Sequence, residues 1–253
     1  MDWRARGIGL RVGGHRGASA VAPENTYMAF EAAIAAGGLY TETDIRASAD
    51  GALVLVHDAT LDRTTNGGGP VSSMTLAQLR ELDAGSWFGD AFRAQRIPEL
   101  PAFLAWLETR APFGAALEIK GKGLGARVAE MAWASPVREN LCIYAFDADE
   151  IRAAKAVAPD FTCILLLHLS DDPKAVIARI EACGGDGADV PWQWNGVALL
   201  AEMRARGYLI GGGSDEGGGA ARELVELGVD VIDTDHPAAL LAAVRDLGGG
   251  DRH

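Results

Sequence analysis

The sequence predicts an α/β protein, a (βα)8 barrel with a small insertion after the His57-Asp58 pair. Its 253 residues and 49% hydrophobic content suit one barrel-sized domain with a substantial core. Short apolar runs recur along the chain, and helix-like stretches lie between many of them. Such alternation is typical of a parallel sheet covered by helices.

The apolar runs indicate strands, because each is short and turn-forming or helix-like segments separate them. Nine such runs are present, one more than an eight-stranded barrel requires. They lie at residues 12–15, 39–45, 53–57, 115–119, 141–145, 162–167, 188–190, 208–212 and 229–233.

The segment between the first two runs, ENTYMAFEAAIAAGG, predicts a helix. Asn25 or Thr26 can accept an amide hydrogen bond at its start, and Phe30 and Ala33 share one face. Gly37 can adopt the left-handed conformation that ends a helix. The segments GVALLAEMRARG and GAARELVELG repeat this pattern, and each ends in glycine just before another strand-like run.

The surplus strand is explained by residues 41–58, TETDIRASADGALVLVHD. Asp50-Gly51 is a strong signal for a two-residue hairpin turn. A turn centred there pairs residues whose numbers sum to 101, which places Asp44 opposite His57. If the returning arm lies outside the barrel, eight strands remain to close it.

Residues 60–98 differ from the rest of the chain because they are rich in turn formers, with one short helical patch from Leu76 to Leu82. A segment of this length is too long for an ordinary connection. We therefore expect a single catalytic domain over residues 1–253, in which residues 60–98 form a small insertion that caps the active-site face.

Composition restricts the classes of partner and compartment. The net charge of −12 disfavours binding to nucleic acid or to anionic membranes. No apolar run approaches the roughly 20 residues that span a bilayer, and Gly and Arg interrupt the N-terminal apolar patch before a signal peptide could form. Cys142, Cys163 and Cys183 are widely spaced, which favours buried free thiols. We expect a cytoplasmic protein, and the sequence leaves a homo-oligomer open.

Three carboxylates form a candidate metal site. Glu42 and Asp44 stand at i and i+2, so on a strand they point to the same side, and like charges this close repel unless a proton or cation lies between them. Glu118 ends another apolar run and completes an all-oxygen set. Such ligands favour Mg²⁺ or Ca²⁺ first and Mn²⁺ next. The alternatives are a solvated edge strand and a strand-end ion pair between Glu118 and Lys120.

Two histidines and two cations accompany the carboxylates. His15-Arg16 follows the first strand-like run, and His57 ends the returning arm. A lone histidine at a strand end is usually a packing residue, but a pair beside carboxylates can divide proton removal and proton donation. Arg16 and Lys120 can hold an anionic centre. In a parallel barrel these strand ends converge on one face.

Taken together, these segments resemble the glycerophosphodiester phosphodiesterase family. The paired His-Arg-Gly and His-Asp elements, with Glu-x-Asp between them and Glu-x-Lys after them, form a specific signature. The similarity runs in order from His15 to about residue 120 and returns at residues 228–237. The similar segments are GGHRGASAVAPENTYMAFEAAIAAGG, ETDIRASADGALVLVHDATLDRTTNG, IPELPAFL, LEIKGKG and GVDVIDTDHP.

The resemblance implies a TIM barrel that hydrolyses small glycerophosphodiesters to glycerol 3-phosphate and an alcohol. It also implies one divalent cation on Glu42, Asp44 and Glu118. The remaining roles that it implies are an acid/base pair, His15 and His57, and phosphate binding by Arg16 and Lys120.

Two departures concern the pocket for the alcohol or glycerol group. Ala145-Phe146 stands where the family often has Ser-Phe, and residues 209–219, LIGGGSDEGGG, replace a Trp-Thr-Val-Asn-like element. Asp215 and Glu216 oppose an anion, so a flexible surface loop is favoured there over a phosphate cradle. Trp192 and Trp194 suit either a leaving-group pocket or core packing.

Several alternatives stay open. The nucleophile is either water or the glycerol hydroxyl beside the phosphate. A phospholipase D-like or lysophospholipase activity, or a catalytically silent barrel that binds phosphorylated polyols, fits the same residues.

Overall fold

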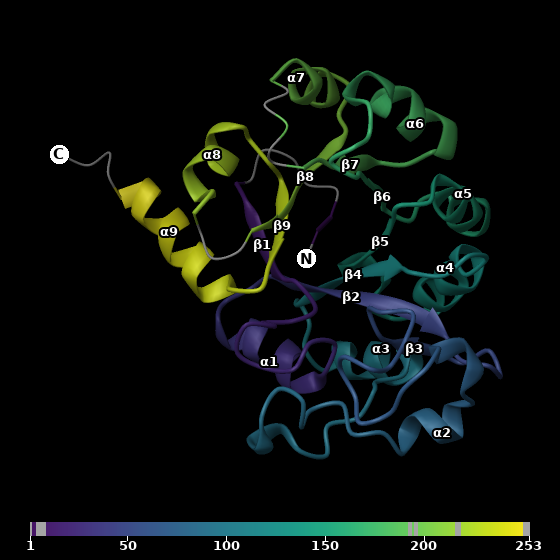
Figure 1. The fold of residues 1–253 in the computed structure, drawn as a ribbon. Helices are drawn as coiled ribbons and strands as arrows, with labels where there is room; N and C mark the ends of the chain where they lie inside the picture. Colours follow the sequence, from purple (N-terminus) through teal and green to yellow (C-terminus); the bar gives the residue numbers. More distant parts are fainter. Residues whose placement is uncertain (1, 4–8, 192–193, 195–196, 216–218, 250–253) are drawn as a thin grey trace.

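The computed structural model describes residues 2–3, 9–191, 194, 197–215 and 219–249. Eight parallel strands close into a barrel, because the strand order β1-β9-β8-β7-β6-β5-β4-β2 is completed by pairing between β1 and β2 (Figure 1). This confirms the predicted (βα)8 fold. The strands are β1 (Arg11–Gly14), β2 (Tyr40–Ala47), β4 (Gly114–Ile119), β5 (Leu141–Ala145), β6 (Cys163–Leu166), β7 (Gly187–Asp189), β8 (Leu209–Asp215) and β9 (Val231–Thr234).

Helices surround the barrel and bury their apolar faces against the outer side of the sheet (Figure 1). The interior of the barrel holds a separate apolar cluster that includes Tyr40, Cys142 and Tyr144. The helices are α1 (Tyr27–Ala35), α2 (Leu76–Arg80), α3 (Leu100–Glu108), α4 (Gly125–Ala134), α5 (Ala148–Val157), α6 (Val176–Cys183), α7 (Val197–Ala205), α8 (Ala221–Glu226) and α9 (Pro237–Gly249). Short 3-10 turns lie at Val71–Ser73, Asp90–Phe92, Arg138–Asn140 and Pro173–Ala175.

Helix α1 forms for the reasons its sequence predicts. The Thr26 side chain accepts a hydrogen bond from the Ala29 amide at the start of the helix. Phe30 and Ala33 are fully buried, and Gly37 has a φ of +89° just beyond the helix end. Asn25, the other candidate for the cap, points into the barrel mouth instead.

The surplus strand is β3 (Leu53–Leu55), which pairs antiparallel with β2 and lies outside the closed barrel. The predicted register was wrong by one residue. Ile45 lies opposite Leu55, and the Val56 amide donates to the Asp44 carbonyl, so Asp44 faces Val56 rather than His57. The turn contains three residues, since the Ser48 amide bonds the Ala52 carbonyl across residues 49–51.

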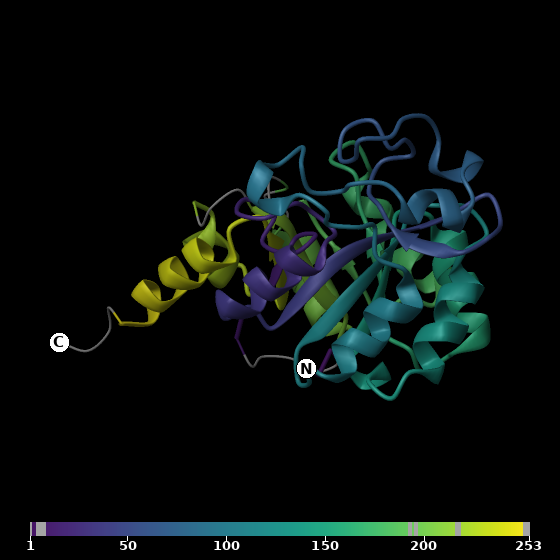
Figure 2. The same cartoon turned by 90° about the horizontal axis from the view of Figure 1, so that it is seen from below.

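Residues 60–98 pack against the β3 arm, and the two segments form a small apolar cluster separate from those of the barrel. Helix α2 is capped by Thr75, whose side chain forms a capping box with Gln78. The helix ends at Arg80, two residues before the predicted Leu82. Figure 2 places this segment and the N terminus at opposite ends of the barrel. The cluster comprises Val54, Val56, Leu61, Val71, Leu79, Ala84 and Ile97.

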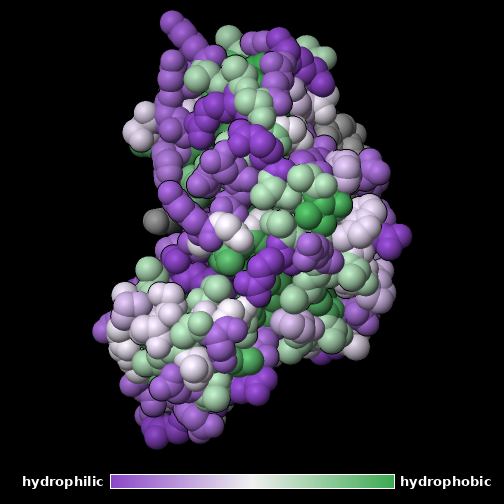
Figure 3. Space-filling view, turned by 90° about the vertical axis from the view of Figure 1, so that its right-hand side faces the viewer, coloured by the Kyte–Doolittle hydropathy of each residue, from purple (hydrophilic) through white to green (hydrophobic). Residues whose placement is uncertain are grey.

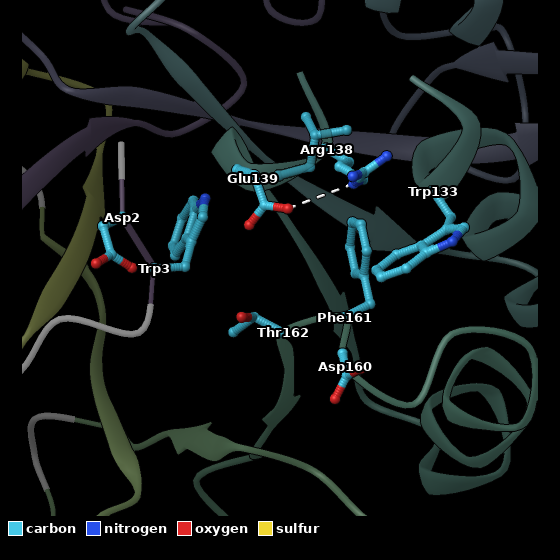
Figure 4. Close-up of a pocket in the computed structure, with 9 residues that line it drawn as sticks. Asp2, Trp3, Trp133, Arg138, Glu139, Asp160, Phe161 and Thr162 are labelled. Carbon is cyan, nitrogen blue, oxygen red and sulfur yellow. Dashed lines mark hydrogen bonds and ion pairs between the residues drawn. The ribbon is translucent and has the colours of Figure 1, made fainter. Parts of the chain in front are cut away.

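The end of the barrel near the N terminus is closed by Trp3, which is 1% exposed. Its ring packs edge-on against Tyr40, with centroids 4.7 Å apart, and its indole N–H donates to the Asn140 carbonyl at 2.9 Å. A cavity of about 380 Å³ lies beside it, with Trp133 and Phe161 among its lining side chains (Figure 4). This cavity is formed by the N-terminal segment, α4 and the segments that lead into β5 and β6.

The surface over α4 to α6 mixes hydrophilic side chains with small hydrophobic patches (Figure 3). Among the described residues, no helix combines the length and hydrophobicity needed to cross a bilayer. Cys142, Cys163 and Cys183 are buried and free, as predicted.

Candidate active site

The barrel brings the three candidate carboxylates into one cluster. Glu42 and Asp44 project from β2, and Glu118 lies directly beside Asp44 on the parallel neighbour β4. One oxygen from each side chain lies within 4.8 Å of the others. All three residues are buried, with exposed fractions of 2%, 0% and 6%. The i and i+2 spacing therefore places both β2 carboxylates in the barrel interior.

Burial and mutual repulsion govern the charge state of this cluster. Burial, followed by repulsion from Asp44, raises the pKa of Glu42 well above its usual range and raises that of Glu118 to about 7. Asp44 differs, because Lys120 and Arg16 lower its pKa despite complete burial. The Lys120 Nζ atom lies 3.3 Å from Asp44 Oδ1 and 2.5 Å from Glu118 Oε1.

The cluster fits a divalent cation. Glu42 Oε1 is buried and accepts no hydrogen bond within the described part of the chain. An acceptor left unpaired in this way is costly unless a cation or proton completes it. The donor set consists of carboxylate oxygens, which hard divalent cations prefer. Glu42, Asp44 and Glu118 would hold such an ion.

Each candidate histidine is oriented by a carboxylate. His15 Nδ1 lies 2.7 Å from Asp235 Oδ1, which also accepts a 2.7 Å bond from the Ser19 hydroxyl. His57 Nδ1 lies 2.6 Å from Asp58 Oδ1. Since an ionised carboxylate only accepts, Nδ1 is the donor in both pairs, and neither contact uses Nε2. Burial, partly offset by the charge of Asp44, lowers the pKa of His57.

Arg16 connects the first strand to the carboxylate cluster. Its backbone has a φ of +56°, a left-handed conformation that aims its amide at Glu42 Oε2, 3.0 Å away. Its guanidinium lies 3.3 Å from Asp44 and donates a 3.0 Å bond to Glu24. The structure thus gathers all seven candidate residues at the carboxyl ends of β1, β2 and β4 and of the β3 arm.

Two further residues support this site, although neither was predicted to belong to it. Asn25 donates to Asp44 Oδ2 at 2.7 Å, and its carbonyl oxygen accepts from the Thr43 hydroxyl at 2.6 Å. Arg46 donates to the backbone carbonyls of His57, at 2.6 and 2.8 Å, and of Lys120, at 3.1 Å. Arg46 could have been predicted to lie near the site, because it stands two residues after Asp44 and residues at this spacing share a strand face.

An aromatic pair lies beside Lys120. The Phe146 ring stacks on His168 with centroids 4.3 Å apart, and Lys120 Nζ lies 5.7 Å from the Phe146 ring centre. Of the two tryptophans predicted near this face, Trp194 donates from its indole to the Leu169 carbonyl at 3.1 Å. Trp192 lies outside the described residues.

The glycine-rich stretch at residues 209–219 is largely a strand. Its first seven residues form β8, which pairs with β7 and β9, so the expected surface loop was wrong for this part. Gly211 is required there, because a side chain would collide with Asp189, 2.7 Å from the position of its Cβ. Glu216 lies outside the described residues.

Comparisons with known proteins agree with this geometry. The profile of the Glycerophosphoryl diester phosphodiesterase family matches residues 15–239. A glycerophosphodiester phosphodiesterase from Caldanaerobacter subterraneus is 32% identical over 238 residues, which are 91% of this chain and 96% of the relative. A shorter match, 46% identical over 107 residues, links 42% of this chain to 43% of a Bacillus subtilis protein.

Solved structures share the fold over nearly the whole chain. A glycerophosphodiester phosphodiesterase from Agrobacterium tumefaciens is 32% identical with a TM-score of 0.79, over 92% of this chain and 99% of the other. A phosphodiesterase from Oleispira antarctica, in complex with the product sn-glycerol-3-phosphate, is 28% identical with a TM-score of 0.86, over 93% and 96%. On the profile match and these similarities, the chain belongs to the glycerophosphoryl diester phosphodiesterase family.

Proposed function

We propose that this protein hydrolyses small glycerophosphodiesters to glycerol 3-phosphate and an alcohol with the help of one divalent cation. The observation that carries the proposal is the buried cluster of Glu42, Asp44 and Glu118, flanked by two carboxylate-oriented histidines. The Oleispira antarctica relative, which holds the product sn-glycerol-3-phosphate on the same fold, supports this choice of substrate.

The cation, when bound, supplies positive charge that stabilises the phosphoryl oxygens in the transition state. Mg²⁺ or Ca²⁺ is favoured and Mn²⁺ comes next, because the three proposed ligands offer only oxygen. Arg16 and Lys120 bind the substrate phosphate. The side chains of Arg16 and Lys120 already lie against the carboxylate cluster, so they are oriented before substrate arrives.

His15 and His57 divide the proton transfers. An alkoxide is a poor leaving group, so one imidazole donates a proton to the departing oxygen while the other removes a proton from the nucleophile. This division applies whether the nucleophile is water or the neighbouring glycerol hydroxyl. Asp235 and Asp58 accept the Nδ1–H of the two imidazoles and leave each Nε2 atom for the reaction. The imidazole that acts as the acid starts with a second proton on Nε2, and the one that acts as the base starts with Nε2 unprotonated.

Residues 60–98 cap the active-site face of a single catalytic domain. Arg63, within this segment, donates hydrogen bonds to Glu24 and Asp58, which follow β1 and the β3 arm. The partners are small molecules, and the acidic surface opposes nucleic acid. The cytoplasmic location and the open question of a homo-oligomer stay predictions.

The decisive test is release of sn-glycerol 3-phosphate from glycerophosphocholine by the purified full-length protein. We expect turnover with Mg²⁺, Ca²⁺ or Mn²⁺ and its loss after treatment with EDTA, with activity restored when the metal is added back. Faster turnover of the acylated substrate lysophosphatidylcholine would favour a phospholipase D-like enzyme. Binding of glycerol 3-phosphate without turnover under any metal would indicate a silent phospho-polyol-binding barrel.

A further inference from the structure

We propose that Arg63 is a positioning residue that sets the orientation of both His57 and Arg16 from the insertion. The inference rests on the proposed function, because it assigns a role in the same reaction to a residue outside the metal, acid/base and phosphate-binding set.

Arg63 binds two carboxylates at once. Its Nε and Nη2 atoms donate to Asp58 at 2.7 and 3.1 Å. Its Nη1 and Nη2 atoms donate to Glu24 at 2.6 and 2.9 Å. Four of the five guanidinium N–H groups are therefore used by these two side chains. A guanidinium so occupied is suited to holding its neighbours in place rather than to binding substrate.

One of the two contacts leads to the proposed acid/base pair. Asp58 Oδ1 accepts from both Arg63 and His57, so the arginine fixes the carboxylate that fixes the imidazole. Without Arg63, the half-buried Asp58 carboxylate is free to rotate about its side-chain bonds. His57 then loses the single orientation that points Nε2 toward substrate.

The other contact leads to the proposed phosphate-binding residue. Glu24 has a side chain only 10% exposed, and its Oε1 atom is shared between Arg63 and Arg16. If Arg63 is removed, the whole charge of this poorly solvated carboxylate acts on Arg16. Arg16 is then held more strongly by Glu24 and is less available to the substrate phosphate.

An ordinary surface ion pair would behave differently. Arg80 lies in the same insertion and pairs with Glu99 at 2.7 Å, but neither residue contacts a member of the proposed site. Exposed pairs of this kind contribute little to stability. Arg80→Ala is therefore a matched control for the loss of an insertion arginine.

The first test compares Arg63→Ala, Arg63→Lys and Arg80→Ala in the full-length, metal-loaded protein, with glycerophosphocholine as substrate. We expect Arg63→Ala to lower kcat about tenfold to a hundredfold and to raise KM, as loss of a residue that orients an active-site group does. Added guanidinium chloride at low millimolar concentration should restore part of the rate. Arg63→Lys should restore little, since an ammonium cannot bind two carboxylates in parallel, and Arg80→Ala should stay within twofold.

The second test separates the effect that Arg63 has on His57 through Asp58 from the effect that it has on Arg16 through Glu24. In an Asp58→Asn background, adding Arg63→Ala should change KM but not lower kcat further. In a Glu24→Gln background, it should lower kcat but leave KM unchanged. Arg63→Ala within twofold of wild type, or a full additional kcat loss in the Asp58→Asn background, would overturn the proposal. If the melting temperature of Arg63→Ala is too low for the assay, the comparison uses the folded Arg63→Lys protein and the recovery of activity in added guanidinium chloride.

Failure of the proposed function is recognised separately, because the wild-type protein itself would then show no turnover. In that case the effect of Arg63 on Arg16 through Glu24 is tested by calorimetric measurement of sn-glycerol 3-phosphate binding. Weaker binding by Arg63→Ala than by Arg80→Ala supports the positioning role, and equal binding contradicts it.

Discussion

At the scale of single residues, the two histidines share a geometry but differ in their surroundings. Asp235, the partner of His15, is held by a neutral serine hydroxyl, whereas Asp58, the partner of His57, is held by the Arg63 guanidinium. Hydrogen bonds from Arg63, partly offset by burial, lower the pKa of Asp58. Asp58 therefore stays ionised at neutral pH and continues to accept the His57 Nδ1–H.

Replacing His57 by alanine tests its proposed role directly. We expect kcat to fall roughly a hundredfold or more, because general acid/base catalysis contributes about this much. Steady-state release of glycerol 3-phosphate under saturating metal is the measurement. His236→Ala is the control, since that side chain is exposed and its backbone bonds are retained. An unchanged rate for His57→Ala would remove His57 from the mechanism.

At the scale of elements, the β2–β3 hairpin is what carries His57 to the barrel mouth. Its turn depends on Gly51, which has a φ of +83°, while Ser48 and Asp50 close the turn through a 2.6 Å side-chain bond. Arg46 then fastens the end of the arm to β4 through backbone carbonyls. The position of the β3 arm is thus fixed at both its turn and its end.

Gly51→Ala should reduce the free energy of unfolding by about 1 kcal/mol. The added methyl group meets no atom closer than 3.9 Å, so the cost comes from left-handed backbone strain alone. Urea denaturation followed by circular dichroism measures this value. Gly219→Ala is the matched control, because Gly219 has open space and no left-handed φ. Equal stability of the two variants would show that the turn tolerates a Cβ.

At the scale of the whole molecule, the barrel has two differently closed ends. Trp3 seals the end near the N terminus against Tyr40 and Tyr144, with ring centroids 4.7 and 6.2 Å away. The opposite end holds the buried carboxylates, and the insertion lies at that end (Figure 2). An aromatic cluster therefore closes one end of the barrel, and the carboxylate cluster lies at the other.

Trp3→Ala should lower the free energy of unfolding by about 3 to 5 kcal/mol, because it opens a cavity under the aromatic cluster. For a chain of this size, that loss corresponds to roughly 10 °C in melting temperature. Differential scanning calorimetry is the measurement. Trp133→Ala should cost clearly less, since its side chain is already 39% exposed. A melting temperature equal to wild type would show that Trp3 does not seal the barrel.

Ionisation of Glu118 should lower the stability of the metal-free protein as pH rises from about 5 to 8. The pKa of Glu118 is about 7 in the folded chain, against 4.5 as its ordinary value, so the folded state binds more protons in this window. Stability falls with pH wherever the folded state binds more protons, here by an amount on the order of 3 kcal/mol.

Thermal melts in EDTA across this pH range measure the effect. A divalent cation should stabilise the protein more at pH 8 than at pH 5, because it competes with protons for the same oxygens. Glu118→Gln should make the fall in stability with rising pH smaller than in wild type. Equal pH profiles for the two proteins would contradict a raised pKa at Glu118.

Local patterns in the sequence were sufficient to predict the fold and to choose the candidate site residues. Strand runs, the hairpin excursion and the i, i+2 pairs are local patterns, because strand geometry fixes which neighbours share a face. Glu42 and Asp44 were identifiable for this reason, and so was the surplus arm that became β3. Thr26 was likewise predictable as a candidate helix cap, because the side chain of a cap accepts a hydrogen bond from an amide no more than three residues away.

Contacts between segments that lie far apart in the sequence became known only from the folded chain. His15 meets Asp235 across 220 residues of sequence, and Arg63 meets Glu24 across 39. No local pattern encodes such contacts, because they arise only when the barrel closes and the insertion folds back over it. The same holds for the hairpin register, where a third turn residue shifted the pairing by one and placed Val56, not His57, opposite Asp44.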